Sequence, residues 1–272
     1  MKLPLVSIIV PTKNSQATLE ECLSSIDKQS YANIELVVVD NFSDDSTPEI
    51  AKRHTNHFFS KGPERSAQRN FGVSKARGEF VVIIDSDMNL SEDVISECVH
   101  LLKTDKHAVG VVIPEESFGE GFWAQCKKLE RSFYLGVPYI EAARFFRKGV
   151  YEKVGGYDVD MTSGEDWDLS QRIEQHGELA RCESFIYHNE GRISLWKTIS
   201  KKYYYAKLFS AYQSKGTSPK IVKQTSVIGR YMLFFSKPRK LFANPALGIG
   251  MLFMKTCEFA FGGFGLLVSK FK

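Results

Sequence analysis

The chain has 272 residues, a length that allows one large domain or two small ones, and its 43% apolar and 25% charged residues are typical of a folded globular protein. Its five cysteines lie far apart and include no CxxC motif, which argues against a disulfide framework and favours a reducing, cytoplasmic setting. The first residues form a strand pattern without a small-residue cleavage site, so we do not expect a signal peptide.

The net charge of +4 conceals an uneven distribution along the chain. Residues 196–272 contain 14 Lys and Arg side chains and a single acid, Glu258, whereas the preceding 195 residues contain 22 basic and 31 acidic side chains. A basic, aromatic-rich tail on an acidic body predicts that the tail meets an anionic surface.

Strand and helix patterns alternate along residues 5–113. An uninterrupted apolar run at 80–84 and mostly apolar runs at 5–10 and 34–39 predict strands that are buried on both faces, as in a parallel sheet. Further strands are expected at 57–60 and 108–113. Helices are expected at 15–26 and at 66–75, and another follows a turn over 41–50, with Pro48 near its first turn. The first helix is expected to be capped by Ser15, with an apolar face formed by Leu19, Cys22, Leu23 and Ile26. This order of elements implies parallel pairing with right-handed crossovers.

The alternation breaks down after Pro114. An amphipathic helix is predicted over 118–136, a strand followed by a helix over 144–154, a helix over 165–176, and one strand over 179–187 that ends before His188. From Trp196 onward we expect helices rich in Tyr, Phe and Lys.

Two acids, Asp85 and Asp87, follow the predicted strand at 80–84. Carboxylates in this position are costly to desolvate unless a positive charge lies between them, and a hard divalent cation could supply that charge. In open α/β sheets, ligands also bind beyond the carboxyl ends of the strands. The alternative is a solvated acidic turn before a helix that is capped by Ser91. The residues by themselves leave both interpretations open.

Five motifs follow one another in a characteristic order: VSIIVPTKN, ELVVVDNFSDDST, AQRNFGVSKARGEFVVIIDSD, FFRKGVYEKVGGYD and GEDWDLSQRI. In this order they resemble the family 2 glycosyltransferases with the GT-A fold, and the resemblance covers about residues 5–190. It implies an α/β fold with a Rossmann-like, mostly parallel sheet flanked by helices, here with a C-terminal helical extension. Three parts are expected: a nucleotide-sugar-binding half over 1–114, an acceptor-binding and catalytic half over 115–195, and a basic, aromatic-rich helical segment over 196–272.

The resemblance also implies a role for individual residues. Those assigned to the nucleotide-sugar donor are Pro11, Thr12, Asn14, Asp40, Arg69, Asn70, Asp85, Ser86 and Arg192. A carboxylate such as Asp40 can accept hydrogen bonds from a base or ribose, and an arginine such as Arg69 can contact phosphate in a bidentate manner. The alternatives are a turn former at Asp40 and an ordinary surface arginine at Arg69.

The metal implied by the resemblance is Mg²⁺ or Mn²⁺, and its candidate ligands are Asp85, Asp87 and His188. The metal would neutralise the diphosphate as it leaves. The alternative for His188 is a buried, hydrogen-bonded histidine.

The resemblance assigns catalysis to Asp166 and Glu165, at the start of a predicted helix. Asp166 would be the base that removes the proton from the acceptor hydroxyl, and Glu165 would orient the acceptor or the sugar. A single base implies inversion in one displacement. Without the resemblance, acids that favour a helix N-terminus would explain both residues better.

The expected activity is transfer of one sugar, because the Gln-x-x-Arg-Trp motif of processive members is absent at Gln171 and no multi-helix membrane region is evident. The rival interpretation is a catalytically silent nucleotide-sugar-binding or interaction protein on the same fold. A nucleotidyltransferase would need a glycine-rich loop that VPTKNSQ does not provide. No nucleic-acid partner is expected.

The segment after Trp196 suggests a lipid-linked acceptor, with the protein at the cytoplasmic face of a membrane. Residues 246–268 are long enough to span a bilayer, but Lys255, Glu258 and five glycines favour an in-plane or re-entrant anchor. The alternatives are that these helices cover the catalytic domain or form a homodimer interface, and that the acceptor is soluble.

Overall fold

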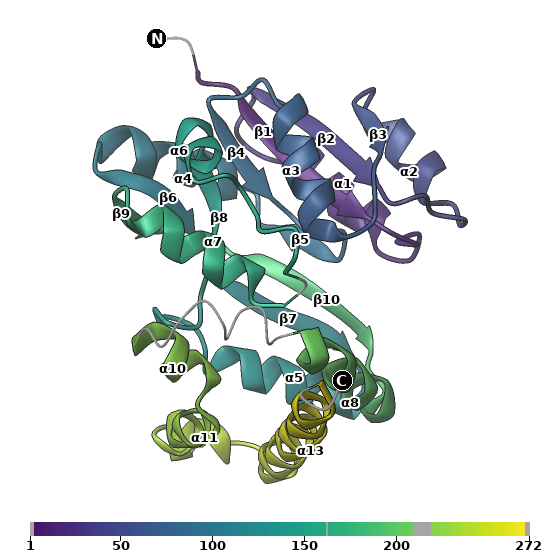
Figure 1. Cartoon of the computed structure of the whole chain (residues 1–272), viewed down its shortest axis with the longest axis vertical. Helices are drawn as coiled ribbons and strands as arrows, with labels where there is room; N and C mark the ends of the chain where they lie inside the picture. Colours follow the sequence, from purple (N-terminus) through teal and green to yellow (C-terminus); the bar gives the residue numbers. More distant parts are fainter. Residues whose placement is uncertain (1–2, 162, 209–218, 270–272) are drawn as a thin grey trace. The chain divides into compact units, whose positions relative to one another are not determined.

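The computed structural model describes residues 3–161, 163–208 and 219–269 (Figure 1). Along these ranges the chain forms two compact units, and each is described by itself. Unit 1 consists of the described residues of Met1–Glu115, Ala142–Val159 and Glu165–His188, and unit 2 of those of Glu116–Glu141, Asp160–Gly164 and Asn189–Lys272. The three-part division stays a prediction, and its first boundary lies beside the first boundary between the units.

A seven-stranded sheet forms the centre of unit 1, in the order β3-β2-β1-β4-β8-β6-β9. Its strands are β1 (Val6–Thr12), β2 (Ile34–Asp40), β3 (Phe58–Ser60), β4 (Phe80–Ile83), β6 (Ala108–Val112), β8 (Ala143–Arg147) and β9 (Glu178–Arg181). Only β8 is antiparallel to its neighbours, β4 and β6, and the other pairs are parallel. The mostly parallel sheet is therefore confirmed.

Helices cover both faces of this sheet (Figure 1). Because successive side chains of a strand point to opposite faces, Ile8 packs in one core and Ile9 in the other. The first core includes residues of α1 (Leu19–Asp27), α2 (Thr47–His54) and α4 (Val94–Thr104). The second includes residues of α3 (Arg65–Lys75), α6 (Lys148–Lys153) and α7 (Glu165–Glu174). Burial on both faces explains why the central strands are mostly apolar runs.

Three predicted elements differ from the structure. The first helix begins at Leu19, because the chain after Ser15 forms a turn in which the Ser15 carbonyl accepts the amides of Thr18 and Leu19. The helix expected over 118–136 is α5 (Gly121–Ser132), since the residues before it form the strand β7 (Glu115–Glu120).

The single strand expected over 179–187 is wrong. It is two strands, β9 and β10 (Ile186–Arg192), because the Glu97 carboxylate accepts the amides of Glu183 and Ser184 at 2.6 and 2.9 Å and turns the chain. β10 then pairs antiparallel with β5 (Met88–Leu90), in a smaller sheet of order β5-β10-β7. His188 consequently lies within a strand, opposite Met88, and does not follow one.

Unit 2 is mainly helical. Besides α5 it contains α8 (Leu195–Leu208), α10 (Pro219–Thr225), α11 (Val227–Phe235), α12 (Pro238–Leu241) and the long α13 (Pro245–Ser269). Its apolar core is formed by Cys126, Phe133, Phe234, Leu241, Met251 and Met254. Gly250 allows α13 to approach α5 closely, since a Cβ there would lie 2.4 Å from the Phe122 ring and 2.8 Å from Cys126 Sγ. Helices after Trp196 are thus confirmed for the described residues, and residues 209–218 lie outside them.

Four charged side chains pair between α5 and α13, and we call them the charge tetrad: Lys127, which is half-buried, and Glu130, Lys255 and Glu258, which are buried. Lys255 Nζ lies 2.6 Å from Glu130 Oε1 and 2.8 Å from Glu258 Oε2. Lys127 Nζ lies 2.9 Å from Glu130 Oε2 and 3.5 Å from Glu258 Oε1. Two positive and two negative charges therefore compensate one another within unit 2.

Candidate active site

The parallel strands β1, β2 and β4 end at one edge of the sheet, which brings together Thr12, Asp40 and the loop that contains Asp85. Asp40 is 1% exposed and accepts hydrogen bonds from Thr12 Oγ1 at 2.8 Å, Ser43 N at 2.7 Å and Ser43 Oγ at 2.6 Å. Asp40 therefore holds the loop after β2 in place. Its polar atoms are used inside the protein, and the sequence did not reveal this.

The loops after β1, β2 and β4 are linked by short polar contacts. Asn14 adopts a left-handed backbone conformation, with φ of 49°, and its amide donates to Ser43 Oγ at 2.8 Å. The hydroxyls of Ser15 and Ser86 lie 2.8 Å apart. Asn14 is exposed and Ser86 half-buried, whereas Pro11 and Thr12 are buried within β1. Three separate segments thus form one polar surface at the edge of the sheet.

Arg69 of α3 lies among the carboxylates of this edge, although the sequence suggested a phosphate contact. Its side chain is 1% exposed, and its NH2 donates to Asp85 Oδ1 at 2.6 Å. Its NH1 lies 3.2 Å from Asp166 Oδ1 and 3.4 Å from Glu165 Oε1. Burial by itself would raise the pKa of Asp85, but Arg69 and then Arg144 hold it well below its ordinary value. One arginine thus connects the acids that follow β4 to the acids that begin α7.

Asp166 is held by two donors on the same oxygen. Tyr157 Oη donates to Oδ1 at 2.9 Å, and Arg69 NH1 lies 3.2 Å from that atom. Burial raises the pKa of Tyr157 well above its ordinary value, and the charge of Asp166 adds to the effect, so the phenol stays a donor. The other oxygen, Oδ2, lies 4.0 Å from Arg144 NH2. The side chain of Asp166 is 26% exposed, and Oδ2 is the oxygen that neither of these two donors contacts.

Glu165, in contrast, is buried. Its side chain is 3% exposed and lies 2.7 Å from Arg65 Nε as well as 3.4 Å from Arg69 NH1. Burial raises the pKa of Glu165, with a further contribution from the neighbouring charge of Asp166. Its contacts are with the arginines of α3.

Arg144 and Glu115 belong to the same cluster, and sequence reasoning missed them. Arg144 Nε donates to Glu115 Oε1 at 2.6 Å, and Arg144 NH1 lies 3.6 Å from Asp85 Oδ2. Within the described residues, this NH1 is buried without a hydrogen bond. The available signal was a charged residue inside the apolar strand β8, where an unpaired charge would be costly. Asp85 and Asp166 therefore each face two buried guanidinium groups.

The three candidate metal ligands differ in how well their surroundings suit a metal ion. Asp87 is 41% exposed and its Oδ2 lies 3.2 Å from His188 Nε2, so an oxygen and a nitrogen donor are adjacent. His188 Nδ1 lies 4.0 Å from Glu115 Oε2. Asp85 instead directs its oxygens at Arg69 and Arg144. Within the ranges that the structure describes, no group of three or more His, Cys, Asp or Glu side chains could hold a metal.

Two other predicted residues lie apart from these acids. Asn70 supports the chain around Tyr157: its Nδ2 donates to Tyr157 O at 2.7 Å, and its Oδ1 accepts from Tyr157 N at 2.8 Å and Tyr151 Oη at 2.7 Å. It therefore positions the phenol that holds Asp166. Arg192 is exposed at the end of β10, in unit 2.

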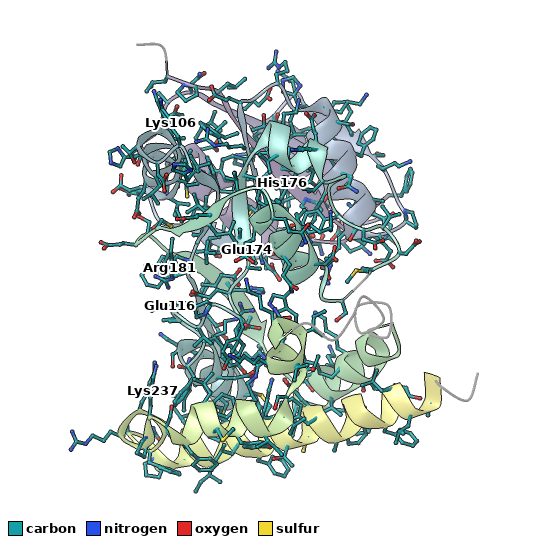
Figure 2. The ribbon with its side chains drawn as sticks, turned by 60° about the vertical axis from the view of Figure 1, so that its left-hand side comes forward. Lys106, Glu116, Glu174, His176, Arg181 and Lys237 are labelled. Carbon is teal, nitrogen blue, oxygen red and sulfur yellow. The ribbon has the colours of Figure 1, made fainter. Side chains whose placement is uncertain are left out.

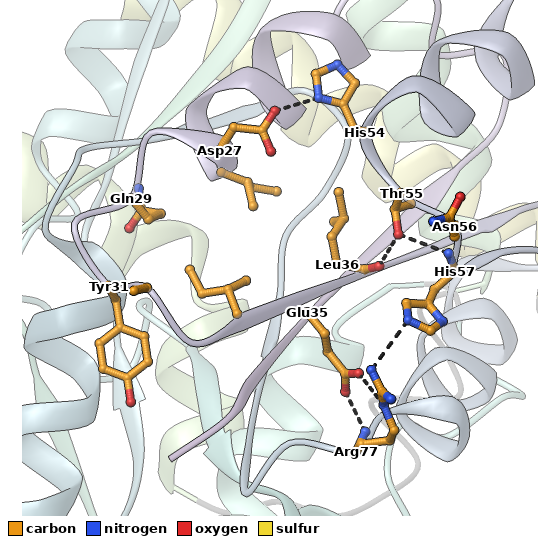
Figure 3. A pocket seen from close by; sticks show the side chains of 13 residues that line it. Asp27, Gln29, Tyr31, Glu35, Leu36, His54, Thr55, Asn56, His57 and Arg77 are labelled. Carbon is orange, nitrogen blue, oxygen red and sulfur yellow. Dashed lines mark hydrogen bonds and ion pairs between the residues drawn. The ribbon is translucent and has the colours of Figure 1, made fainter. Parts of the chain in front are cut away.

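Figure 3 shows a different hollow of unit 1, with a volume of about 510 Å³. Several of its polar groups pair with one another, as Glu35 does with Arg77 at 2.8 Å and His54 with Asp27 at 2.7 Å. It is lined by none of the predicted site residues. We therefore do not assign the donor to this hollow.

Residues 7–157 match the family described as Glycosyl transferase family 2, and this is more than half of the chain. The chain belongs to this family. The predicted family is thus confirmed, and the matched range includes the loops that contain Asp40, Asp85 and Tyr157.

Relatives and solved structures agree with this membership. Glycosyltransferase GlyG of Streptococcus pneumoniae serotype 4 is 37% identical over 99 residues, which are 34% of this chain and 33% of that protein. A Campylobacter jejuni protein named GalNAc(5)-diNAcBac-PP-undecaprenol beta-1,3-glucosyltransferase is 33% identical over 104 residues, 35% of this chain and 33% of that protein. The chain spans only 33 to 44% of the length of three of the curated glycosyltransferases it matches.

The mannosyltransferase PcManGT from Pyrobaculum calidifontis, solved in complex with GDP-Man and Mn²⁺, superposes with a TM-score of 0.59. The match covers 92% of this chain and 74% of that chain, at 20% sequence identity. At this identity the likeness shows the fold alone, and it confirms the predicted GT-A architecture.

Proposed function

We propose that this family 2 protein transfers one sugar from a nucleotide-sugar donor to an acceptor hydroxyl with inversion. The observation that carries the proposal is the pairing of Arg69 with both Asp85 and Asp166. It couples the acids expected at the donor to the acid expected to act as base. A base also needs an accessible oxygen, and Oδ2 of Asp166 meets this requirement.

In the proposed reaction Asp166 removes the proton from the acceptor hydroxyl. The acceptor oxygen then forms a bond to the anomeric carbon while the bond from that carbon to the diphosphate breaks. The nucleoside diphosphate leaves with the bonding electrons, and the anomeric configuration inverts in one displacement. Tyr157 and Arg69 fix Oδ1 so that Oδ2 faces the acceptor. We assign Glu165 a positioning role through Arg65 and Arg69, because it is almost fully buried.

The donor is proposed to lie over the loops after β1, β2 and β4. Asn14 and Ser86 offer polar atoms there, while Pro11, Thr12 and Asp40 shape the loops. Arg69 and Arg144 would compensate diphosphate charge by exchanging a carboxylate oxygen for a phosphate oxygen. Asn70 acts by supporting Tyr157, and Arg192 stays a candidate for phosphate contact through the family resemblance alone. GDP-Man in the mannosyltransferase complex supports the class of donor but not its sugar.

A divalent cation, Mg²⁺ or Mn²⁺, would be held by Asp87 and His188, with Asp85 as a third ligand if its arginine contacts give way. Such a cation stabilises negative charge on the leaving diphosphate. The Mn²⁺ of the mannosyltransferase complex supports this proposal.

We expect chelation with EDTA to abolish turnover and added Mn²⁺ or Mg²⁺ to restore it, because phosphate oxygens and Asp87 are hard ligands. Asp87→Asn should raise the metal concentration for half-maximal rate by about tenfold or more. Rates are measured as nucleotide release across a metal titration, with EDTA presaturated with Mg²⁺ as the control. Full activity in EDTA would contradict the metal assignment.

The acceptor is proposed to be a lipid-linked glycan, reached at the cytoplasmic face of a membrane in cell-surface glycan or glycolipid assembly. The name of the Campylobacter jejuni relative, which contains undecaprenol, supports this acceptor class. The basic composition of residues 196–272 supports an anionic surface nearby. A soluble acceptor and a homodimer through the helices of unit 2 are the alternatives.

One observation favours a silent binding protein instead. Arg69 and Arg144 already neutralise Asp85, so this acid has no need of a metal ion to compensate its charge. The function is tested by incubating the full chain with a panel of nucleotide sugars and measuring released nucleotide. Slow hydrolysis of one donor, with a product of inverted configuration by NMR once the acceptor is found, is the expected result. Donor binding without any release would instead identify the silent protein.

A further inference from the structure

Helix α13 presents a long surface without any charge. Its two charged residues, Lys255 and Glu258, are 7% and 3% exposed. Large apolar side chains along the helix are exposed, and we call them the α13 stripe: Ile249, Phe253, Phe264 and Leu267, at 62, 54, 58 and 57%. Their spacing puts them on one face of the helix, opposite the charged residues. By length and composition α13 could also cross a membrane.

The charge tetrad fixes which face of α13 is available. Lys255 and Glu258 are paired with Glu130 and Lys127 of α5, so the polar side of α13 is bound within unit 2. The sequence suggested that these two charges disfavour a simple membrane span. In the structure they are compensated, and the opposite face carries no charge. Withdrawing α13 to span a bilayer would separate both pairs and expose four charges.

Neighbouring helices add apolar and basic side chains. Tyr231 of α11 contacts α13 through Thr256, with the two hydroxyl oxygens 2.6 Å apart. On α11, Ile228 and Met232 are 74% and 63% exposed. Lys237 lies at one end of these helices (Figure 2), and Arg239 follows it in α12. Because Glu258 is the only acid after Trp196 and is buried, the exposed charges described on this part of the chain are positive.

We infer that α13 lies in the plane of an anionic bilayer surface, with the α13 stripe at the boundary of the acyl chains and with Lys237 and Arg239 among the lipid phosphates. Interfacial helices combine an apolar face with flanking basic residues in this manner. Positive charge on this unit complements anionic lipid, whereas a second copy would bring like charges together. This inference rests on the proposed function in one respect: the purpose of lying on the membrane would be to reach a membrane-borne acceptor.

Flotation of the full chain with vesicles tests the surface. We expect the chain to float with vesicles of phosphatidylcholine and phosphatidylglycerol at low salt, and less in high salt. Lys237→Glu with Arg239→Glu, and separately Phe253→Gln with Phe264→Gln, should each weaken partitioning by on the order of tenfold or more. The matched control is Lys103→Glu with Lys106→Glu in unit 1, where Lys106 is exposed (Figure 2). Absence of flotation at low salt overturns the inference.

Depth measurements distinguish lying in the plane from spanning. Phe253→Cys and Leu267→Cys, each in a Cys257→Ser background, accept an environment-sensitive fluorophore, while the other four cysteines are buried. At 1.5 Å per residue the two positions are about 21 Å apart along the axis. Equal, shallow quenching by lipid-borne quenchers is expected. Depths that differ by about this distance would identify a spanning helix and overturn the inference.

Two further measurements separate this inference from the proposed function. Sedimentation without vesicles should show a monomer, and a dimer that Phe253→Gln with Phe264→Gln dissociates would mean that a second copy covers the stripe. Nucleotide release by the full chain in solution does not depend on docking. Release without flotation therefore rejects the membrane surface alone, and flotation without release rejects the transferase alone.

Discussion

Replacing Asp166 with Asn is expected to lower kcat by about 10² to 10⁴ while KM for the donor changes little. The amide keeps the size of the side chain and can still accept from Tyr157, but it cannot take the acceptor proton. The measurement is the initial rate of nucleotide release over a range of donor concentrations.

The matched control is Asp168→Asn on the same helix, whose carboxylate is 2.6 Å from Arg172 NH2 and lies outside the cluster around Arg69. Its thermal midpoint is recorded beside its rate, because removal of this pair costs some stability. Tyr157→Phe should lower kcat less than Asp166→Asn, since it leaves the base in place but loosens it. If Asp166→Asn keeps kcat and raises only KM, Asp166 is a binding residue and the base is elsewhere.

Lys255→Met is expected to lower the free energy of unfolding by about 3–5 kcal/mol, the typical cost of leaving a buried charge uncompensated. After the change, Lys127 remains with two carboxylates, Glu130 and Glu258. Lys255→Met combined with Glu258→Leu restores neutrality with one pair, so it should recover most of the loss. Urea unfolding measures both variants, and Lys223→Met on the exposed surface of the same unit should change stability by less than about 0.5 kcal/mol.

The sign of the pH dependence follows from the same tetrad. Burial would raise the pKa of Glu130, but Lys127 and Lys255 hold it well below the ordinary value of 4.5. Burial would lower the pKa of Lys255, but Glu130 and Glu258 raise it above 10.5. The carboxylate contribution is therefore present above pH 4.5 and lost as the pH falls, and the lysine contribution is lost as the pH rises beyond 10.5. If the Lys255→Met variant is as stable as the wild type between pH 4.5 and pH 10.5, the role of the tetrad is contradicted.

Much of unit 1 could be predicted from the sequence because its signals are local. An apolar run such as Phe80–Ile83 needs only its own residues to identify a strand that is buried on both faces. The motifs that surround Asp85 and Asp166 identified the family and indicated the acids that we propose carry the chemistry. The break between β9 and β10 was not predictable in this way, since it depends on Glu97, 86 positions before Glu183.

The sequence by itself therefore determined the family, the mostly parallel sheet and the positions of the acids. The tertiary structure decided which charges meet. Arg69 contacts Asp166 across 97 positions, and Lys255 contacts Glu130 across 125, so neither pair leaves a periodic pattern in the chain. The same pairing changes the interpretation of α13, because a charge in an apolar segment weakens a membrane role only if it has no buried partner. Burial and pairing are properties of the folded chain, and they arise only when distant segments pack together.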